Sequence, residues 1–106
     1  MPKYLVIASY TAEGIKGVLK DGGTKRRQAA ESALKSVGGR VEAFYFAFGD
    51  QDVVVLIDAP DNVSVAAASM AIAASGAVQT KTIVLLTPEE VDQATKKTTT
   101  YQPPGR

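Results

Sequence analysis

The sequence contains no cysteine and no histidine. The lack of cysteine excludes disulfides and thiol nucleophiles, and the lack of both residues excludes the usual zinc sites. Histidine is also the side chain that most often serves as a general base near neutral pH. A metal site could therefore be built only from carboxylates, and any catalysis would have to use other titratable groups. We expect no metal and no cofactor.

A large excess of charge of either sign is also missing. Twelve Lys and Arg residues face eleven Asp and Glu residues, which leaves a net charge of +1. Such a chain has no strong field to attract nucleic acid or an anionic membrane. The basic cluster Lys25–Arg27 is best interpreted as a solvated helix face. We expect neither nucleic acid nor membrane as a partner.

Long apolar runs are absent as well. No run approaches the ~20 residues of a spanning helix, and the first residues lack the pattern of a secretion signal. These features favour a cytoplasmic protein. The 106 residues suffice for one domain with one core. We expect this domain over residues 1–95 and a flexible polar tail over 96–106.

The apolar runs and turn signals predict four strands, over residues 3–9, 40–48, 52–59 and 77–86. Helices are predicted after Thr11, from Thr24 to about Val37, over 63–75, and after Thr87. Glycines at 14 and 17 favour a short or irregular first helix. The order βαββαβ is that of the ferredoxin-like α+β fold, with an antiparallel four-stranded sheet and both main helices on one face.

The second and third strands are apolar on both faces. In the second strand, alternation puts Phe44, Phe46 and Phe48 on one face and Val41, Ala43, Tyr45 and Ala47 on the other. Soluble monomers rarely expose such a face to water. We therefore expect a homodimer or higher homo-oligomer, with two sheets meeting face to face as a dimeric α/β barrel. The alternative, that the terminal helix folds back over the open face, is disfavoured because this helix is short.

Three blocks of the sequence resemble the GYD domain family: Tyr10–Gly17, Gly38–Asp61 and Ala73–Glu90. The family's signature has an aromatic residue between the glycine-acid pair and the next aspartate, whereas this chain has Gln51 there. The resemblance implies a ferredoxin-like fold that pairs as a dimeric barrel, and little about activity. Weaker, fold-level similarities extend to effector-binding domains of leucine-responsive regulators and to dimeric-barrel monooxygenases and isomerases.

The turn Gly49–Asp52 contains the first candidate site residues. The simplest interpretation is a hairpin turn whose aspartates bind local amides. A functional interpretation puts Asp52 on the rim of a cavity between subunits, where burial would raise its pKa. Tyr45 is either a core aromatic or a hydrogen-bond donor to a ligand. Lys81 either protects an edge strand or points into that cavity.

Three functions are compatible with these residues. The first is a homo-oligomeric protein that binds a small apolar or amphipathic molecule between subunits, through Ser9, Tyr10, Tyr45, Asp50 and Asp52. The second is a cofactor-independent oxygenase or isomerase, in which Asp52 acts as base while Tyr45 and Lys81 stabilise negative charge. The third is a structural assembly unit with a filled core. The sequence does not decide whether the protein is an enzyme, although the lack of histidine and cysteine favours the first function.

Overall fold

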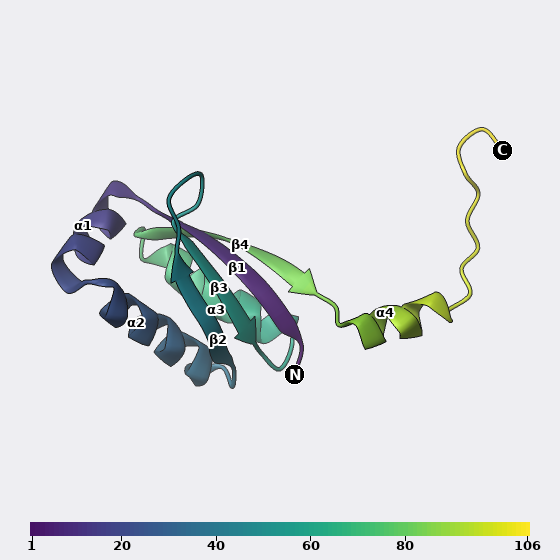
Figure 1. Cartoon of the computed structure of the whole chain (residues 1–106), viewed down its shortest axis with the longest axis horizontal. Helices are drawn as coiled ribbons and strands as arrows, with labels where there is room; N and C mark the ends of the chain where they lie inside the picture. Colours follow the sequence, from purple (N-terminus) through teal and green to yellow (C-terminus); the bar gives the residue numbers. More distant parts are fainter.

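The computed structural model describes all 106 residues and shows an antiparallel four-stranded sheet with helices packed on one face (Figure 1). The strands are β1 (Lys3–Tyr10), β2 (Arg40–Phe46), β3 (Val53–Asp58) and β4 (Val78–Leu85), in the order β2-β3-β1-β4. The helices are α1 (Ala12–Asp21), α2 (Gly23–Ser36), α3 (Asn62–Ala74) and α4 (Pro88–Thr95). This confirms the predicted ferredoxin-like α+β fold.

The core lies between the sheet and helices α2 and α3. Alternate residues of the central strands point toward the helices, so that Tyr4, Val55 and Ile57 are buried. Leu34 of α2 and Val65 of α3 cover them from above. Only twelve of the 106 residues are buried, so this core is thin for a domain of this length. None of the four helices combines the length and the apolar character needed to cross a bilayer.

Side-chain caps fix three of the four helix starts. Thr11 accepts a hydrogen bond from the Gly14 amide, and Asp61 accepts one from the Ser64 amide. Thr87 and Glu90 form a reciprocal capping box at the start of α4. The expected cap at Thr24 is wrong: α2 begins at Gly23, and its N-cap, Gly22, has no side chain to offer.

A β-bulge in β2 corrects the predicted faces of this strand. The register with β3 shifts between Val41 and Ala43, which makes Glu42 the extra residue. Val41 therefore packs toward the helices with Phe44, rather than sharing a face with Ala43 as the alternation predicted. The strand also ends at Phe46, so Phe48 lies fully exposed in the following loop instead of extending the aromatic face.

Helix α1 is a regular ten-residue helix, contrary to the irregular segment that its glycines suggested. The lack of a side chain at Gly14 lets α1 pack closely against its neighbour and does not make the helix irregular. It is buried against the loop before β4, where the Ala77 carbonyl accepts a 2.9 Å hydrogen bond from the Thr11 amide. A Cβ atom at position 14 would collide with that carbonyl oxygen. Gly17, three residues on, has open space around it.

We predict opposite effects for alanine at these two glycines. Gly14→Ala should lower the free energy of unfolding by roughly 1 to 3 kcal/mol, because the backbone of the neighbouring loop must move. Gly17→Ala should raise it by about 0.5 to 1 kcal/mol, because alanine favours the helix. Urea denaturation at one fixed protein concentration measures both. Equal effects of the two variants would show that Gly14 is not required for this contact.

Helix α4 points away from the sheet and touches neither of its faces (Figure 1). None of its residues is buried, and the chain is elongated, with a longest dimension of 57 Å. The alternative in which the terminal helix folds back over the sheet is therefore not what the structure shows. The face of the sheet opposite α2 and α3 is left without a cover from its own chain.

Candidate functional site

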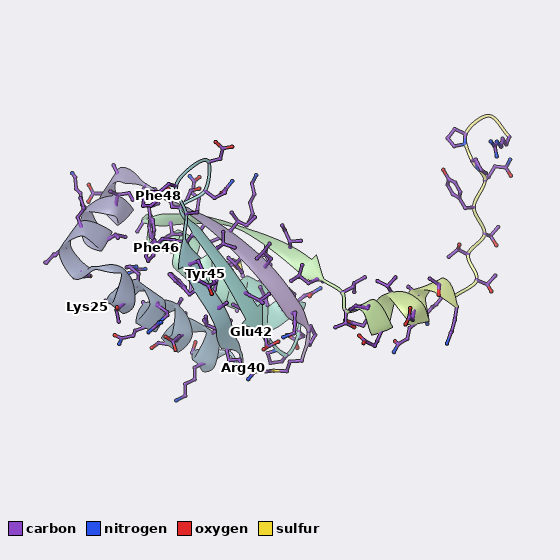
Figure 2. All side chains as sticks on the ribbon, in the orientation of Figure 1. Lys25, Arg40, Glu42, Tyr45, Phe46 and Phe48 are labelled. Carbon is purple, nitrogen blue, oxygen red and sulfur yellow. The ribbon has the colours of Figure 1, made fainter.

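The uncovered side of the sheet, which we call the open face, carries apolar residues from all four strands. They occupy the positions that alternate with the core residues and comprise Leu5, Ile7, Ala43, Tyr45, Val54, Leu56, Ile83 and Leu85. Tyr45 is 70% exposed and Ile83 44% exposed; Tyr45 projects from β2 in Figure 2. The middle of the open face is thus apolar, as the two-sided pattern of the strands predicted. Lys3, Asp58, Ser9, Gln79 and Lys81 add polar groups at its ends and on β4.

One row of residues crosses the open face from edge to edge. Tyr45 on β2 pairs with Val54 on β3, Val54 with Ile7 on β1, and Ile7 with Lys81 on β4. The row spans three strand spacings, so the backbones of Tyr45 and Lys81 lie about 14 Å apart. The structure places these two predicted site residues on the same face but at opposite edges.

Asp52 holds the end of the sheet together. Its carboxylate accepts a 2.8 Å hydrogen bond from the Tyr10 amide, and its own amide donates to the Ala8 carbonyl at 2.9 Å. Its carbonyl accepts a 2.8 Å hydrogen bond from the Ala47 amide. These bonds join the residue before β3 to β1 and to the end of β2. The role of Asp52 as a base or ligand contact stays a prediction.

The remaining predicted ligand residues do not converge on one site. The Ser9 hydroxyl donates to the Gln51 side-chain oxygen at 3.3 Å, near Asp52. Tyr10 lies on the opposite side of the sheet, facing the helices. Asp50 is exposed in the loop between β2 and β3. No group of three or more acidic side chains is placed to hold a metal ion.

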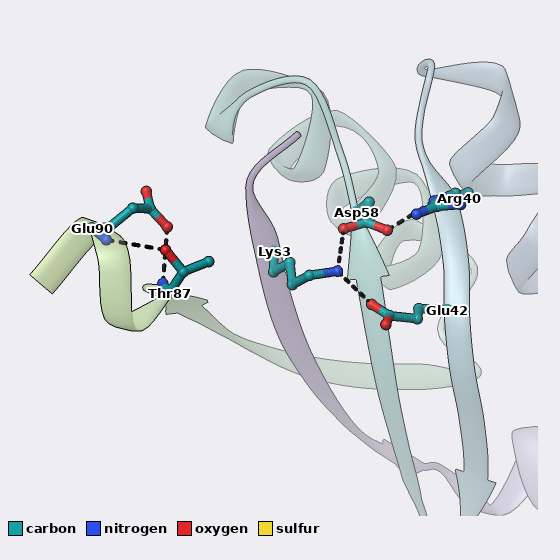
Figure 3. Close-up of polar contacts among 6 residues, drawn as sticks. All are labelled: Lys3, Arg40, Glu42, Asp58, Thr87 and Glu90. Atoms are coloured by element: carbon teal, nitrogen blue, oxygen red, sulfur yellow. Dashed lines mark hydrogen bonds and ion pairs between the residues drawn. The ribbon is translucent and has the colours of Figure 1, made fainter.

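An ionic cluster at the other end of the open face was not foreseen from the sequence (Figure 3). Asp58 of β3 is 3% exposed. It accepts a 2.8 Å bond from Lys3 and another 2.8 Å bond from Arg40. Lys3 also donates to Glu42 at 2.6 Å, which the bulge brings within reach. These residues come from three strands, so no local sequence motif predicts the cluster.

These bonds shift two pKa values. The hydrogen bond from Lys3, followed by that from Arg40, lowers the pKa of Asp58, although burial opposes the shift. The hydrogen bonds from Lys3 to Asp58 and then to Glu42 raise the pKa of Lys3. Because the pKa of Asp58 is lower in the folded than in the unfolded chain, the carboxylate stabilises the fold fully at pH values above its unfolded pKa of ~3.9. This stabilisation is lost as the pH falls through its pKa in the folded protein.

We predict that Asp58→Asn lowers the free energy of unfolding at pH 7 by roughly 1 to 3 kcal/mol. Asparagine carries no negative charge and offers one acceptor oxygen in place of two, so the two cations Lys3 and Arg40 lose their counter-charge and one of them loses its acceptor. The difference from the wild type should begin to shrink as the pH drops below ~4, where Asp58 takes up a proton in the unfolded chain, and should go on shrinking toward the lowered pKa of Asp58 in the folded protein. Urea denaturation from pH 3 to pH 7 measures this, with Asp50→Asn in the exposed loop as control. A difference that stays constant over this range would contradict the role given to the carboxylate.

A separate cavity of about 240 Å³ lies on the helix side of the sheet, between α2, α3 and the strands. Fourteen of its eighteen lining residues are hydrophobic. Tyr10 is among them, together with Phe44, Leu34 and Ile72. Arg26 of α2 is its one charged lining residue. This space lies inside a single chain, unlike the predicted cavity between subunits.

Comparison with known proteins finds one named relative and one matching domain family. The chain is 29% identical over 83 residues to the "Glutamine synthetase and cystathionine beta-lyase binding protein" of Thermus thermophilus. The aligned region covers 78% of this chain and 86% of the relative. No solved structure gives a significant match. The model of the GYD domain matches residues 4–95, nearly all of the chain, and the chain therefore belongs to the GYD domain family.

Proposed function

We propose that this chain is a homo-oligomeric binding protein whose copies pair through their open faces. The observation that carries the proposal is an apolar face that spans all four strands and that no segment of its own chain covers. A face of this kind on a soluble protein is a site of association. A second copy fits it because the two faces are identical and a two-fold axis makes the contact self-complementary.

The size of the open face is compatible with a stable pair. Four strands at ~4.8 Å and about eight residues at ~3.3 Å give a plate of roughly 19 by 26 Å. With the relief of its side chains, such a plate approaches the ~800 Å² per partner of a standard interface. If about 60% of the ~1,600 Å² on the two faces together is apolar, ~25 cal/mol per Å² gives a gross gain on the order of 25 kcal/mol, against an association cost of about 4 to 15 kcal/mol.

Helix α4 supports the same proposal. It has eight residues, and helices this short are marginal in water unless they pack against something. Val91 of α4 is 46% exposed, and Leu86, in the segment just before the helix, is 60% exposed. We infer that α4 reaches across to the paired copy, where its apolar residues would extend the interface beyond the sheet.

The assembled protein would bind other proteins. The relative from Thermus thermophilus is named for binding glutamine synthetase and cystathionine beta-lyase. That name supports a binding role for a chain with this fold, and we extend it to partner proteins of the same class. The space between two facing sheets as a small-molecule site stays a prediction.

The alternative of a cofactor-independent enzyme has weaker support. It requires Asp52, Tyr45 and Lys81 to act on one substrate. Within one chain, Tyr45 and Lys81 lie at opposite edges of the sheet, and the Asp52 carboxylate already accepts the Tyr10 amide. Only residues from two paired copies could bring these groups together, so this hypothesis itself depends on pairing.

A charge in the middle of the open face tests the pairing. Ile7→Glu should convert the oligomer into monomers at micromolar concentration, because the carboxylate would be buried without a counter-charge in the partner. Its neighbour Lys81 on β4 can pair with the new charge in the monomer, where both groups stay in contact with water. Pairing of two copies would still take both charges out of water, which costs several kcal/mol per ion. Sedimentation velocity measures the assembly, and circular dichroism measures the fold.

Met70→Glu is the matched control. Met70 is 67% exposed on α3, away from the open face, and the same charge there should leave the assembly intact. Val54→Glu provides a second disruption in the same row if Ile7→Glu unfolds the chain. A wild-type protein that sediments as a single subunit, or an Ile7→Glu variant that still assembles, would overturn the proposal.

Partner binding has its own test. Surface plasmon resonance should detect binding of the wild-type oligomer to immobilised glutamine synthetase of the same organism, with a Kd in the micromolar range or tighter. If Ile7→Glu binds more weakly, Met70→Glu again serves as the control, because it adds the same charge without loss of assembly. Absence of binding at tens of micromolar to both glutamine synthetase and cystathionine beta-lyase would rule out these partners while leaving the pairing result unaffected.

A further inference from the structure

The cavity on the helix side exists because the helices above it carry small side chains. Ala29 and Ala30 of α2 and Ala68 of α3 line it, and their methyl groups are too small to fill the space above the sheet. Helices α2 and α3 also contact each other only sparsely, which leaves a space between them that extends down to the sheet. The core is thus underfilled at one defined place.

Arg26 is the feature that distinguishes this cavity from a simple packing defect. It lies in the first turns of α2 and is half-buried, and its Nε atom is fully buried without a hydrogen-bond partner. It forms no ion pair, and no acidic residue lines the cavity. Buried polar atoms are almost always partnered, so an acceptor that enters the cavity would complete the bonding of Nε. An anion suits this position best, because the group is a cation.

Neighbouring groups make the site still more favourable to an anion. Lys25 and Arg27 flank Arg26 on the same turn, and that turn contains no acidic residue. The hydroxyl-bearing residues Tyr10, Ser69 and Thr80 also line the cavity and add hydroxyl groups that can donate hydrogen bonds. The rest of the lining is mainly apolar. The complementary ligand therefore has a charged end and an apolar body.

We propose that this cavity binds an amphipathic monocarboxylate, with the apolar body between α2, α3 and the sheet and the carboxylate on the Arg26 guanidinium. Guanidinium groups match carboxylates in shape as well as in charge. An engineered protein cavity of ~150 Å³ holds benzene, so a cavity of 240 Å³ has room for about ten non-hydrogen atoms. A medium-chain fatty acid such as octanoate has this size.

This proposal is independent of the proposed function. The cavity and the open face lie on opposite sides of the sheet, so a ligand can occupy the former whether or not two copies pair through the latter. Monomeric Ile7→Glu protein should bind the same ligand as the wild type. Loss of pairing and loss of ligand binding can therefore be observed separately.

The experiment is isothermal titration calorimetry with octanoate and with its neutral counterpart 1-octanol. The wild type should bind one octanoate per chain, and more tightly than 1-octanol. Arg26→Gln should weaken octanoate binding about tenfold or more and leave 1-octanol unchanged, because only the charged contact is lost. Arg27→Gln is the matched control: this neighbour pairs with Glu31 outside the cavity, at 3.5 Å, and should change octanoate binding less than about twofold.

A second pair of variants tests the position of the apolar body. Ala30→Leu should fill the cavity and abolish binding of both probes, with circular dichroism to check the fold, and Ala68→Leu serves in its place if the first variant unfolds. No octanoate binding at millimolar concentration would overturn the proposal. Equal octanoate affinity in the wild type and Arg26→Gln would overturn it too, and so would undiminished binding in the cavity-filling variants.

Discussion

The hydrophobic effect acts on both faces of the four-stranded sheet, but the chain supplies helices for only one of them. Val53, Val55 and Ile57 of β3 are buried beneath α2 and α3, while Val54 and Leu56 of the same strand face outward. The six residues of β3 alone show this imbalance, because its two faces are apolar and only one of them is covered. The chain buries the face beneath the helices in a thin core and leaves the other face uncovered.

Small side chains determine how the helices pack on the covered side of the sheet. The alanines of α2 and α3 allow the helices to lie on the sheet but do not fill the space between them. Gly14 lets α1 approach the loop before β4 so closely that no other residue fits there without movement. The domain thus combines one very tight contact with one loosely packed region next to it, since Tyr10 borders both.

Local signals in the sequence predicted much of this fold. The caps at Thr11, Asp61 and Thr87 each depend on a side chain and an amide three residues away, so they can be recognised without knowledge of the tertiary structure. The strand order followed from the order of the elements. The Thr24 cap failed because α2 begins at Gly23, so that its N-cap is Gly22, two residues earlier, and has no side-chain bond.

The features that the sequence did not reveal depend on register between distant strands. Lys3 and Asp58 are 55 residues apart, and they meet because β1 and β3 pair in one particular register. The bulge at Glu42 depends on the same kind of information, and it changed the face assigned to Val41. Of the candidate site residues, Tyr45 and Lys81 were correctly placed on strands, and the predicted fold puts these strands at opposite edges of the sheet. That the two residues end one row across the open face depends on register and could not be predicted. The unpartnered Arg26 was set aside as a solvated cation.

The bulge also determines what kind of assembly remains open to the molecule. An edge strand with a regular ladder invites another strand to add alongside it, and repeated addition leads to fibres. Glu42 interrupts the ladder on β2 and places a carboxylate there, while Lys81 and Gln79 occupy the other edge on β4. These features disfavour the addition of another strand at either edge of the sheet. The proposed pairing through the open face would use up that face in a single step, so such an assembly would close and would not propagate.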